Sequence, residues 1–207
     1  NMRTRLIPKR IADDILELNV STPAIAQAIA NKLRCTNVAE DVVAGLSCVA
    51  IRFSPNQRED VEALLSTVEE MSAPETPGEE AVEIDVQYGG EYGPDLEWIC
   101  TSLKQSQDEF ITLHTRRVHT VEMMGFTPGF SYISGLPNSV KIPRLDEPRP
   151  RVPAGSVGVS SDFTGLYALA GPGGWPLIGR TQEPLFCPDA DEPFKLKPGL
   201  RIRFRAV

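Results

Sequence analysis

The chain has 207 residues, 41% of them hydrophobic and 24% charged, which is enough for one large domain or two small ones. Its 28 acidic residues outnumber 21 lysines and arginines, and the net charge of -7 disfavours a nucleic-acid partner, because phosphate binding needs a basic face. The apolar runs are too short, or too often broken by glycine and proline, to suggest a membrane span.

The first third of the chain alternates strand-like and helix-like segments. Residues 15–20 predict a strand, and the Ser-Thr-Pro run at 21–23 predicts a helix start, since a hydroxyl N-cap followed by proline favours one. Residues 42–46 and 48–53 predict two strands around a tight turn, and a capping box at 54–57 begins a second helix. Residues 82–86 alternate as a last strand. The order predicts a split βαβ sandwich, an α+β domain over residues 1–84.

Residues 85–207 are expected to form a second domain. A short helix is predicted at 94–100, another after the capping box at 106–109, and a strand at 118–124. Ten glycines and eight prolines between 125 and 180 exclude long helices there. The short apolar stretches between them predict the strands of a β-barrel, and these stretches are residues 139–142, 156–159, 166–169 and 200–204.

Several familiar kinds of site are disfavoured. Four widely spaced cysteines without a C-x-x-C pair, and only two histidines, predict no metal site and leave few partners for a serine nucleophile. Residues 174–181 match phosphate-loop spacing, but Pro176 removes an amide and Arg180 replaces the lysine. The basic start of the chain lacks the apolar core of a signal peptide, so a cytoplasmic protein is expected.

Two segments are candidates for ligand binding. Residues 125–136 combine glycines that allow sharp bends, a rigidifying Pro128 and three aromatic residues. They predict either the apolar walls of a site or a barrel corner packed by aromatic rings. Arg149 lies between two prolines, so it is either a preorganised clamp for a carboxylate or phosphate, or a surface arginine paired with a nearby acid.

Residues 82–207 carry five motifs in order, namely Tyr-Gly-Gly-Glu-Tyr-Gly-Pro from Tyr88, Gly-Phe-Thr-Pro-Gly-Phe from Gly125, Pro-Ala-Gly-Ser-Val from Pro153, Pro-Gly-Gly-Trp from Pro172 and Ile-Gly-Arg-Thr from Ile178. Together they resemble one family, the B subunit of 5-oxoprolinase, also called allophanate hydrolase subunit 1. The same family includes the C and D subdomains of the urea carboxylase carboxyltransferase domain and a bacterial inhibitor of a sporulation kinase. The resemblance is strong over residues 82–207, and the first eighty residues match by layout.

The resemblance implies a small N-terminal α+β domain followed by a cyclophilin-like β-barrel over residues 85–207. It also implies a heteromer with the C subunit of the same enzyme, and a third lactam-utilisation subunit that completes it. The complete enzyme opens 5-oxoproline to glutamate with ATP hydrolysis, so this chain is expected to be inactive alone. Two alternatives stay open, namely a carboxyltransferase half-site for urea or a related amide, which needs biotin on a partner, and a binding protein that inhibits a histidine kinase.

The resemblance also implies the site residues. We expect Arg149, and after it Arg144, to bind a carboxylate or a phosphorylated intermediate, and Ser156 with nearby amides to hold an oxyanion. We expect His114 to hydrogen-bond or relay a proton, the alternative being a charge at a helix C-terminus. The substrate-binding candidates are Gly125, Phe126, Pro128, Gly129, Phe130, Tyr132, Arg144 and Arg180.

The chain departs from the family pattern at two positions. His119 stands where the family usually has tyrosine, and Leu200 stands where an acid usually follows Pro-Gly. The second position is expected to alter only a surface turn. The first is expected to lie close to the site and to bear on which substrate is used.

Overall fold

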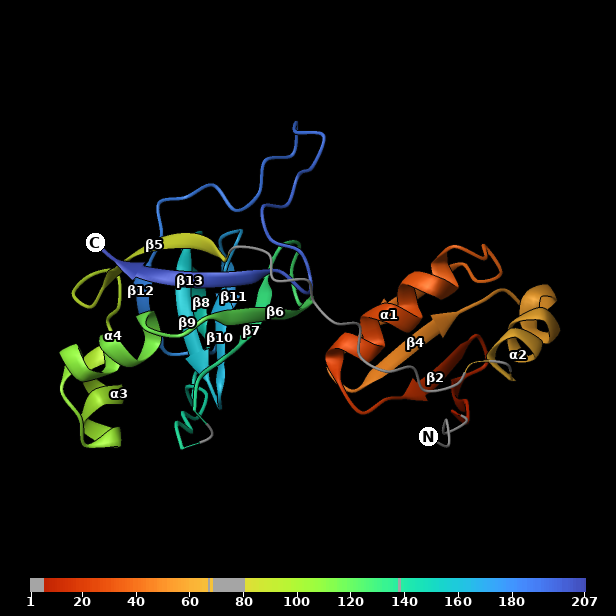
Figure 1. The fold of residues 1–207 in the computed structure, drawn as a ribbon, viewed down its shortest axis with the longest axis horizontal. Helices are drawn as coiled ribbons and strands as arrows, with labels where there is room; N and C mark the ends of the chain where they lie inside the picture. The colour runs from red at the N-terminus through yellow and green to blue at the C-terminus, as the bar shows by residue number, and fades with distance from the viewer. Residues whose placement is uncertain (1–5, 67, 69–80, 138) are drawn as a thin grey trace. The chain divides into compact units, whose positions relative to one another are not determined.

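The computed structural model describes residues 6–66, 68, 81–137 and 139–207 (Figure 1). The chain divides into two compact units, residues 1–77 and 78–207. Each unit has its own cluster of buried apolar side chains.

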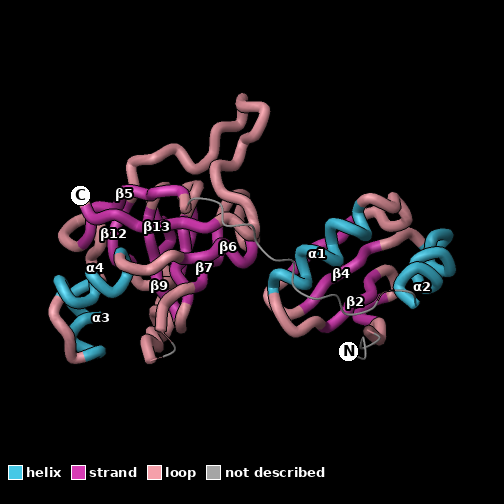
Figure 2. The backbone as a smooth tube through the Cα atoms, viewed as in Figure 1, coloured by secondary structure: helices cyan, strands magenta, loops and turns pink. Residues whose placement is uncertain are grey.

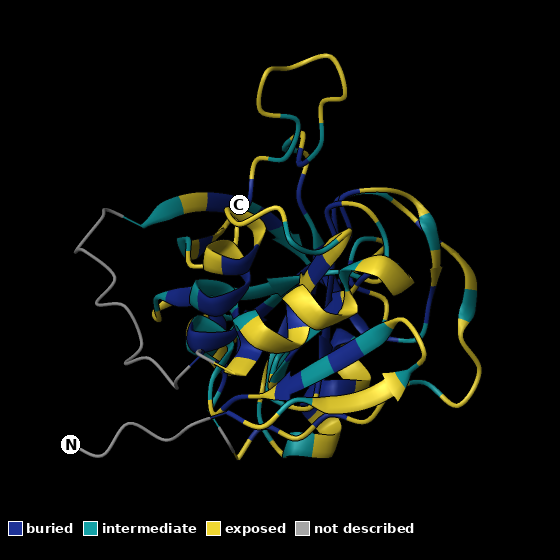
Figure 3. Cartoon of the chain, turned by 90° about the vertical axis from the view of Figure 1, so that its right-hand side faces the viewer, coloured by how far each residue is buried: buried dark blue, intermediate teal, exposed yellow. Residues whose placement is uncertain are grey.

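The first unit is a four-stranded antiparallel sheet with helices. The strands run in the order β1-β2-β4-β3, with β1 at Lys9–Ala12, β2 at Ile15–Asn19, β3 at Asp41–Ala44 and β4 at Cys48–Arg52. The first predicted helix is confirmed as α1 (Pro23–Arg34), where the Thr22 hydroxyl accepts the Ile25 N–H at 3.3 Å. Its apolar face is buried and its outer residues are half-buried or exposed, and the helices in Figure 3 show such alternating bands.

The second predicted helix of this unit is also confirmed. A single 3-10 turn, η1 (Pro55–Gln57), leads into α2 (Arg58–Ser66). The Gln57 side chain accepts the Ser54 N–H at 3.0 Å, as the capping box predicts. Val61 and Leu65 bury the inner face of α2 in the core of the unit.

The fourth strand of the sheet differs from the prediction. We expected residues 82–86 to complete the sheet, but β1 does so, pairing with β2 so that Ala12 lies opposite Ile15 across two intervening aspartates. Strand β1 is mostly exposed, so it lacks the apolar alternation that predicts a strand. The expected boundary at 84/85 therefore falls inside β5 (Val82–Tyr88), which belongs to the second unit.

The second unit is a closed β-barrel, which confirms the predicted fold class (Figure 2). Strand order is β10-β7-β6-β13-β5-β12-β9, and β8 and β11 form a separate two-stranded sheet. The remaining bounds are α3 Leu96–Leu103, α4 Gln107–Thr115, β6 His119–Met124, β7 Ser131–Ser134, β8 Arg149–Val152, β9 Ser156–Ser160, β10 Phe163–Leu166, β11 Gly171–Gly173, β12 Leu177–Arg180 and β13 Arg201–Ala206.

Strand β5 enters the barrel because its partner comes from the far end of the chain. It pairs in parallel with β13, with Ile84 opposite Phe204, and both side chains are buried in the barrel core. The alternating apolar residues of 82–86 therefore face the barrel core, and the sheet of the first unit is not needed to bury them.

Two of the predicted barrel strands are displaced. Residues 139–142 form only an isolated bridge between Ile142 and Ser161, because Pro143 has no N–H with which to continue a ladder. The strand expected at 166–169 instead occupies β10 and ends at Leu166, after which the chain bends toward β11. The apolar run at 166–169 correctly predicts a buried segment, but it does not predict that the strand ends at Leu166.

Candidate functional site

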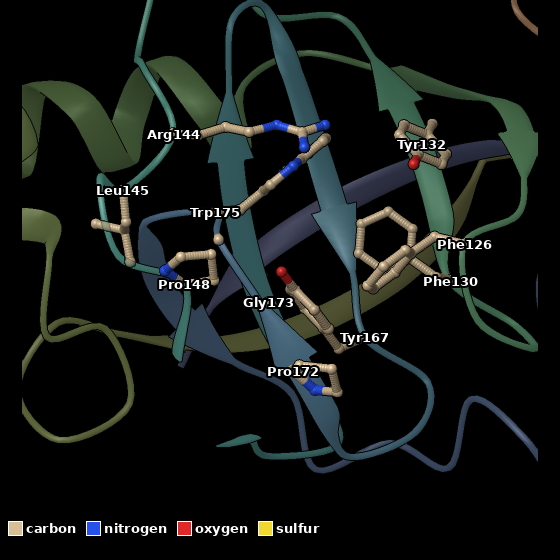
Figure 4. Close-up of a pocket in the computed structure, with 11 residues that line it drawn as sticks. Phe126, Phe130, Tyr132, Arg144, Leu145, Pro148, Tyr167, Pro172, Gly173 and Trp175 are labelled. Carbon is tan, nitrogen blue, oxygen red and sulfur yellow. The ribbon is translucent and has the colours of Figure 1, made fainter. Parts of the chain in front are cut away.

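A pocket of about 290 Å³ opens beside the two-stranded sheet of β8 and β11 (Figure 4). Its residues come from the β6–β7 loop, strand β7, the segment before β8, the segment after β10, and β11 with the two residues that follow it. Five aromatic side chains give it apolar walls, and they are Phe126, Phe130, Tyr132, Tyr167 and Trp175.

Phe130 is the centre of this aromatic wall. Its ring is 2% exposed and meets Tyr167, Tyr132 and Trp175 edge to face, at centroid distances of 4.8, 4.9 and 5.6 Å. Edge-to-face packing is the favoured arrangement of aromatic rings, so the contacts fix the rings relative to one another. The wall is therefore largely formed before any ligand arrives.

The loop that carries Phe126 and Phe130 is strained at its tip. Phe126 has φ of +74° and is 64% exposed, and a bulky residue rarely adopts this backbone region. Gly129 has φ of +77°, and a Cβ there would lie 2.6 Å from that of Ala168, so glycine is required. The loop thus both lines the pocket and forms a packed barrel corner.

Arg144 is the one charged residue among those lining the pocket. The Leu145 N–H donates to the Gly174 carbonyl at 2.8 Å, which fixes this segment beside the pocket. Arg144 reaches across from that side toward Trp175 (Figure 4). Its guanidinium makes no ion pair or hydrogen bond with the described residues, so it is available to an anionic ligand.

Gly165 lies behind the aromatic wall and leaves no room for a side chain. A Cβ there would lie 2.7 Å from Phe130 and 2.8 Å from Trp175. We expect Gly165→Ala to displace both rings and to lower the free energy of unfolding by about 1–3 kcal/mol, measured by chemical denaturation. Gly171→Ala is the matched control, because a Cβ at Gly171 meets nothing within 4 Å. Equal losses in the two variants would contradict this packing.

Arg149 does not line the pocket but joins three elements beside it. Its Nη2 donates to Asp95 Oδ1 at 2.8 Å, and Asp95 Oδ2 accepts the Leu177 N–H at 2.6 Å. The guanidinium thus links β8 to the start of α3 and, through Asp95, to the start of β12. The partner of Arg149 is therefore an acid distant in sequence and not a neighbouring one. Arg149 Nη1 is buried and has no partner within the described ranges.

His114 lies in the barrel core, away from the pocket. It is 0% exposed, its Nδ1 lies 2.6 Å from the Tyr88 hydroxyl, and its Nε2 lies 2.9 Å from the Thr164 hydroxyl. Its ring stacks on Phe204 at 4.4 Å between centroids. Burial, with a smaller contribution from His119, holds the pKa of His114 well below its usual value of 6.5. A neutral His114 ring does not fit the alternative role, in which a charged histidine interacts with the dipole at the C-terminus of its helix.

His119, the departure from the family pattern, lies beside His114 rather than at the pocket. The two ring centroids are 5.0 Å apart. Its ring nitrogens lie 3.0 Å from the Ser134 carbonyl and 2.8 Å from that of His114. Burial lowers the pKa of His119, and these two hydrogen bonds oppose the shift.

Both histidines should make the stability of the chain depend on pH. Their pKa values are lower in the folded state than the usual 6.5, so the unfolded chain binds more protons as the pH falls through 6.5. Stability is fully present above that value, and we expect His114 to cost about 1 kcal/mol between about pH 7.5 and pH 5.5, with His119 acting in the same direction. Denaturant unfolding at the two pH values measures this loss. An unchanged midpoint would contradict the neutral, buried state of the His114 ring.

Two further candidates lie outside the pocket lining, on neighbouring strands. Ser156 begins β9 and is 2% exposed, and Arg180 lies opposite it at the end of β12. Arg180 Nε donates to the Ala154 carbonyl at 2.9 Å, which holds the turn before β9.

The structure brings together only part of the predicted site. Phe126, Phe130, Tyr132 and Arg144 meet in the pocket, and the other loop candidates, Gly125, Pro128 and Gly129, shape the turn that presents them. Tyr167 and Trp175 also line the pocket but were not among the predicted site residues. For Trp175 the sequence did offer an indication, the Pro-Gly-Gly-Trp motif, since aromatic residues in glycine-rich turns often face a ligand or a packed corner.

Among the described residues, no three histidine, cysteine, aspartate or glutamate side chains gather as a group that could hold a metal ion. None of the helices described is both long enough and apolar enough to cross a bilayer.

The fold and the pocket together define a two-unit protein, an α+β unit followed by a β-barrel with a preformed aromatic pocket. The sequence pattern of the carboxyltransferase domain, subdomain C and D, matches residues 9–196. The chain belongs to this family.

Known proteins agree with this assignment. The chain is 45% identical over 144 residues to the 5-oxoprolinase B subunit of Escherichia coli O157:H7, covering 70% of this chain and 66% of that protein. The crystal structure of TTHA0988 matches with a TM-score of 0.78 and 30% identity over 94% of this chain and 40% of that one. The Kluyveromyces lactis urea carboxylase matches 98% of this chain and 22% of its own with a TM-score of 0.75, and at 14% identity it shows the fold alone.

These comparisons confirm the resemblance to the 5-oxoprolinase B subunit. The matched stretch spans about half to two thirds of the length of the curated relatives. The relatives are named as a subunit, which implies that their enzyme has several subunits.

Proposed function

We propose that this chain is a subunit of an ATP-dependent amide-ring hydrolase of the 5-oxoprolinase type, which opens 5-oxoproline to glutamate in the cytoplasm. It works in a heteromer with a C subunit and a third lactam-utilisation subunit, and alone it is inactive. The relatives named as the B subunit of 5-oxoprolinase, 42–45% identical to this chain, support the family of reaction.

The observation that carries the proposal is the chemistry of the pocket. Aromatic faces suit a small, flat ring, and Arg144 supplies a cation at the edge for a carboxylate. A volume of about 290 Å³ is at the lower end for ligand pockets, as expected for a small substrate. A ring amide that bears one carboxylate, such as 5-oxoproline, has both features.

The segment with phosphate-loop spacing, residues 174–181, does not have the structure of a phosphate loop. Within the segment of phosphate-loop spacing, residues 177–180 are strand β12, where Gly179 lies opposite Tyr88 of β5 and Val157 of β9. Backbone groups engaged in a sheet cannot cradle phosphates. The proposal therefore assigns ATP to the assembled complex and gives no residue of this chain a step with it.

The test is to co-purify the chain with the product of its neighbouring gene and measure 5-oxoproline-dependent ATP hydrolysis. We expect activity from the assembled complex and none from the chain alone. Activity of the isolated chain, or none from any assembly, would contradict the proposal. Dependence of the complex on biotin would instead favour the carboxyltransferase alternative. If the chain binds a histidine kinase, and still binds it after Arg144 is replaced, the result would favour the alternative of a kinase-inhibiting binding protein.

A further inference from the structure

Tyr167 is held rigidly at the bottom of the pocket. Both of its backbone groups are bonded, since its N–H donates to the Ser156 carbonyl at 3.0 Å and its carbonyl accepts the Gly155 N–H at 2.7 Å. Its ring packs edge to face against Phe130. The residue is 2% exposed, and its hydroxyl points into the pocket (Figure 4).

The Tyr167 hydroxyl has no side-chain or backbone acceptor for its proton in the described part of the chain. The backbone amide of Trp175 lies on the side of the oxygen and lowers the pKa of the phenol, against the effect of burial. The Gly173 backbone closes one side, because a Cβ there would lie 2.5 Å from the oxygen. A phenolic hydroxyl has one proton to donate, and here that donor faces the pocket (Figure 4).

The hydroxyl is a donor rather than a base. Burial raises the pKa of Tyr167 above its usual value of 10, although Arg144, Arg149 and the Trp175 amide act in the opposite direction. The phenol therefore keeps its proton at neutral pH. What it can offer a ligand is one hydrogen bond to an oxygen.

We infer that Tyr167 donates a hydrogen bond to the carbonyl oxygen of a ring amide bound in the pocket and so determines specificity for lactams. The inference rests on the proposed function and assigns it a second polar contact. Arg144 holds the carboxylate at the rim, the aromatic rings contact the faces of the ligand, and Tyr167 recognises the carbonyl from below. A ring acid without that carbonyl keeps the other contacts and loses only this one.

Two ligands and one substitution separate this contact from the rest. Calorimetric titration of the 207-residue chain would use 5-oxoproline and cyclopentanecarboxylate, which has a ring and a carboxylate but no ring carbonyl. We expect Tyr167→Phe to weaken 5-oxoproline binding by about three- to tenfold, the range for one neutral hydrogen bond, and to leave cyclopentanecarboxylate binding unchanged. Tyr92→Phe, outside the pocket lining, is the matched control and should leave both affinities unchanged.

Three results would overturn the inference, namely equal weakening of both ligands, no change for either, or no binding of 5-oxoproline to the unaltered chain. The turnover assay of the complex separates this failure from that of the proposed function. A complex that hydrolyses 5-oxoproline at full kcat/KM with Tyr167→Phe refutes the inference alone. A complex that never uses 5-oxoproline, while the chain still discriminates between the two ligands as expected, refutes the proposed function alone.

Discussion

Replacing Arg144 with glutamine is expected to lower the kcat/KM of the assembled enzyme for 5-oxoproline by about ten- to hundredfold. A hydrogen bond between an arginine and a carboxylate contributes about 1.5–3 kcal/mol, and at an exposed rim the loss falls toward the lower value. Arg144 is exposed and unpaired within the described chain, so its removal leaves no buried acid behind. The free energy of unfolding should therefore change by less than about 0.5 kcal/mol.

Arg151→Gln is the matched control for this substitution. Arg151 is an exposed arginine on β8 that does not line the pocket, so its loss should leave kcat/KM unchanged. Arg144→Lys should recover only part of the activity, because lysine cannot make the two parallel bonds to a carboxylate. Full activity of Arg144→Gln would contradict the role of the pocket, and equal losses in both glutamine variants would point to a general charge effect.

Replacing His114 with alanine is expected to lower the free energy of unfolding by about 3 kcal/mol or more. The substitution leaves a cavity beside Phe204 and removes the partner of two hydroxyls, those of Tyr88 and Thr164. Denaturant unfolding at about pH 7.5, where the ring is neutral, measures the loss. Thr112→Ala, at an exposed position of the same helix, should cost less than about 0.5 kcal/mol.

The same experiment separates the two roles considered for His114. A core role predicts that the unfolding free energy falls. The catalytic role that the family resemblance implied predicts a stable variant whose complex has lost turnover. A stable, inactive His114→Ala would show that the ring reaches the reacting groups after all.

Local signals account for the elements that the sequence predicted correctly. At Ser106, the side chain accepts the Glu109 N–H at 3.1 Å and the Glu109 carboxylate accepts the Ser106 N–H at 2.7 Å, as the capping box requires. Thr22 begins α1 in the same way. These signals act over three or four residues, so the sequence alone contains them.

The parts that could not be predicted depend on contacts between distant residues. Strand β5 joins β13, more than a hundred residues later, and its alternation fits either unit equally well. The acid that pairs with Arg149 is Asp95, whereas sequence proximity suggested a neighbouring acid. Similarly, nothing in a lone histidine indicates whether it faces the core or a ligand, and His114 faces the core.

The central claim is that 5-oxoproline binds in the aromatic pocket, and Trp175 can report it directly. The chain has two tryptophans, Trp98 and Trp175, so Trp98→Phe leaves the one in the pocket as the only indole. Titration of this variant with 5-oxoproline should change the Trp175 emission saturably, and the additional substitution Arg144→Gln should shift the titration to higher concentrations. Unchanged Trp175 emission, while the assembled enzyme carrying Trp98→Phe turns over 5-oxoproline, would place the substrate elsewhere and contradict the account.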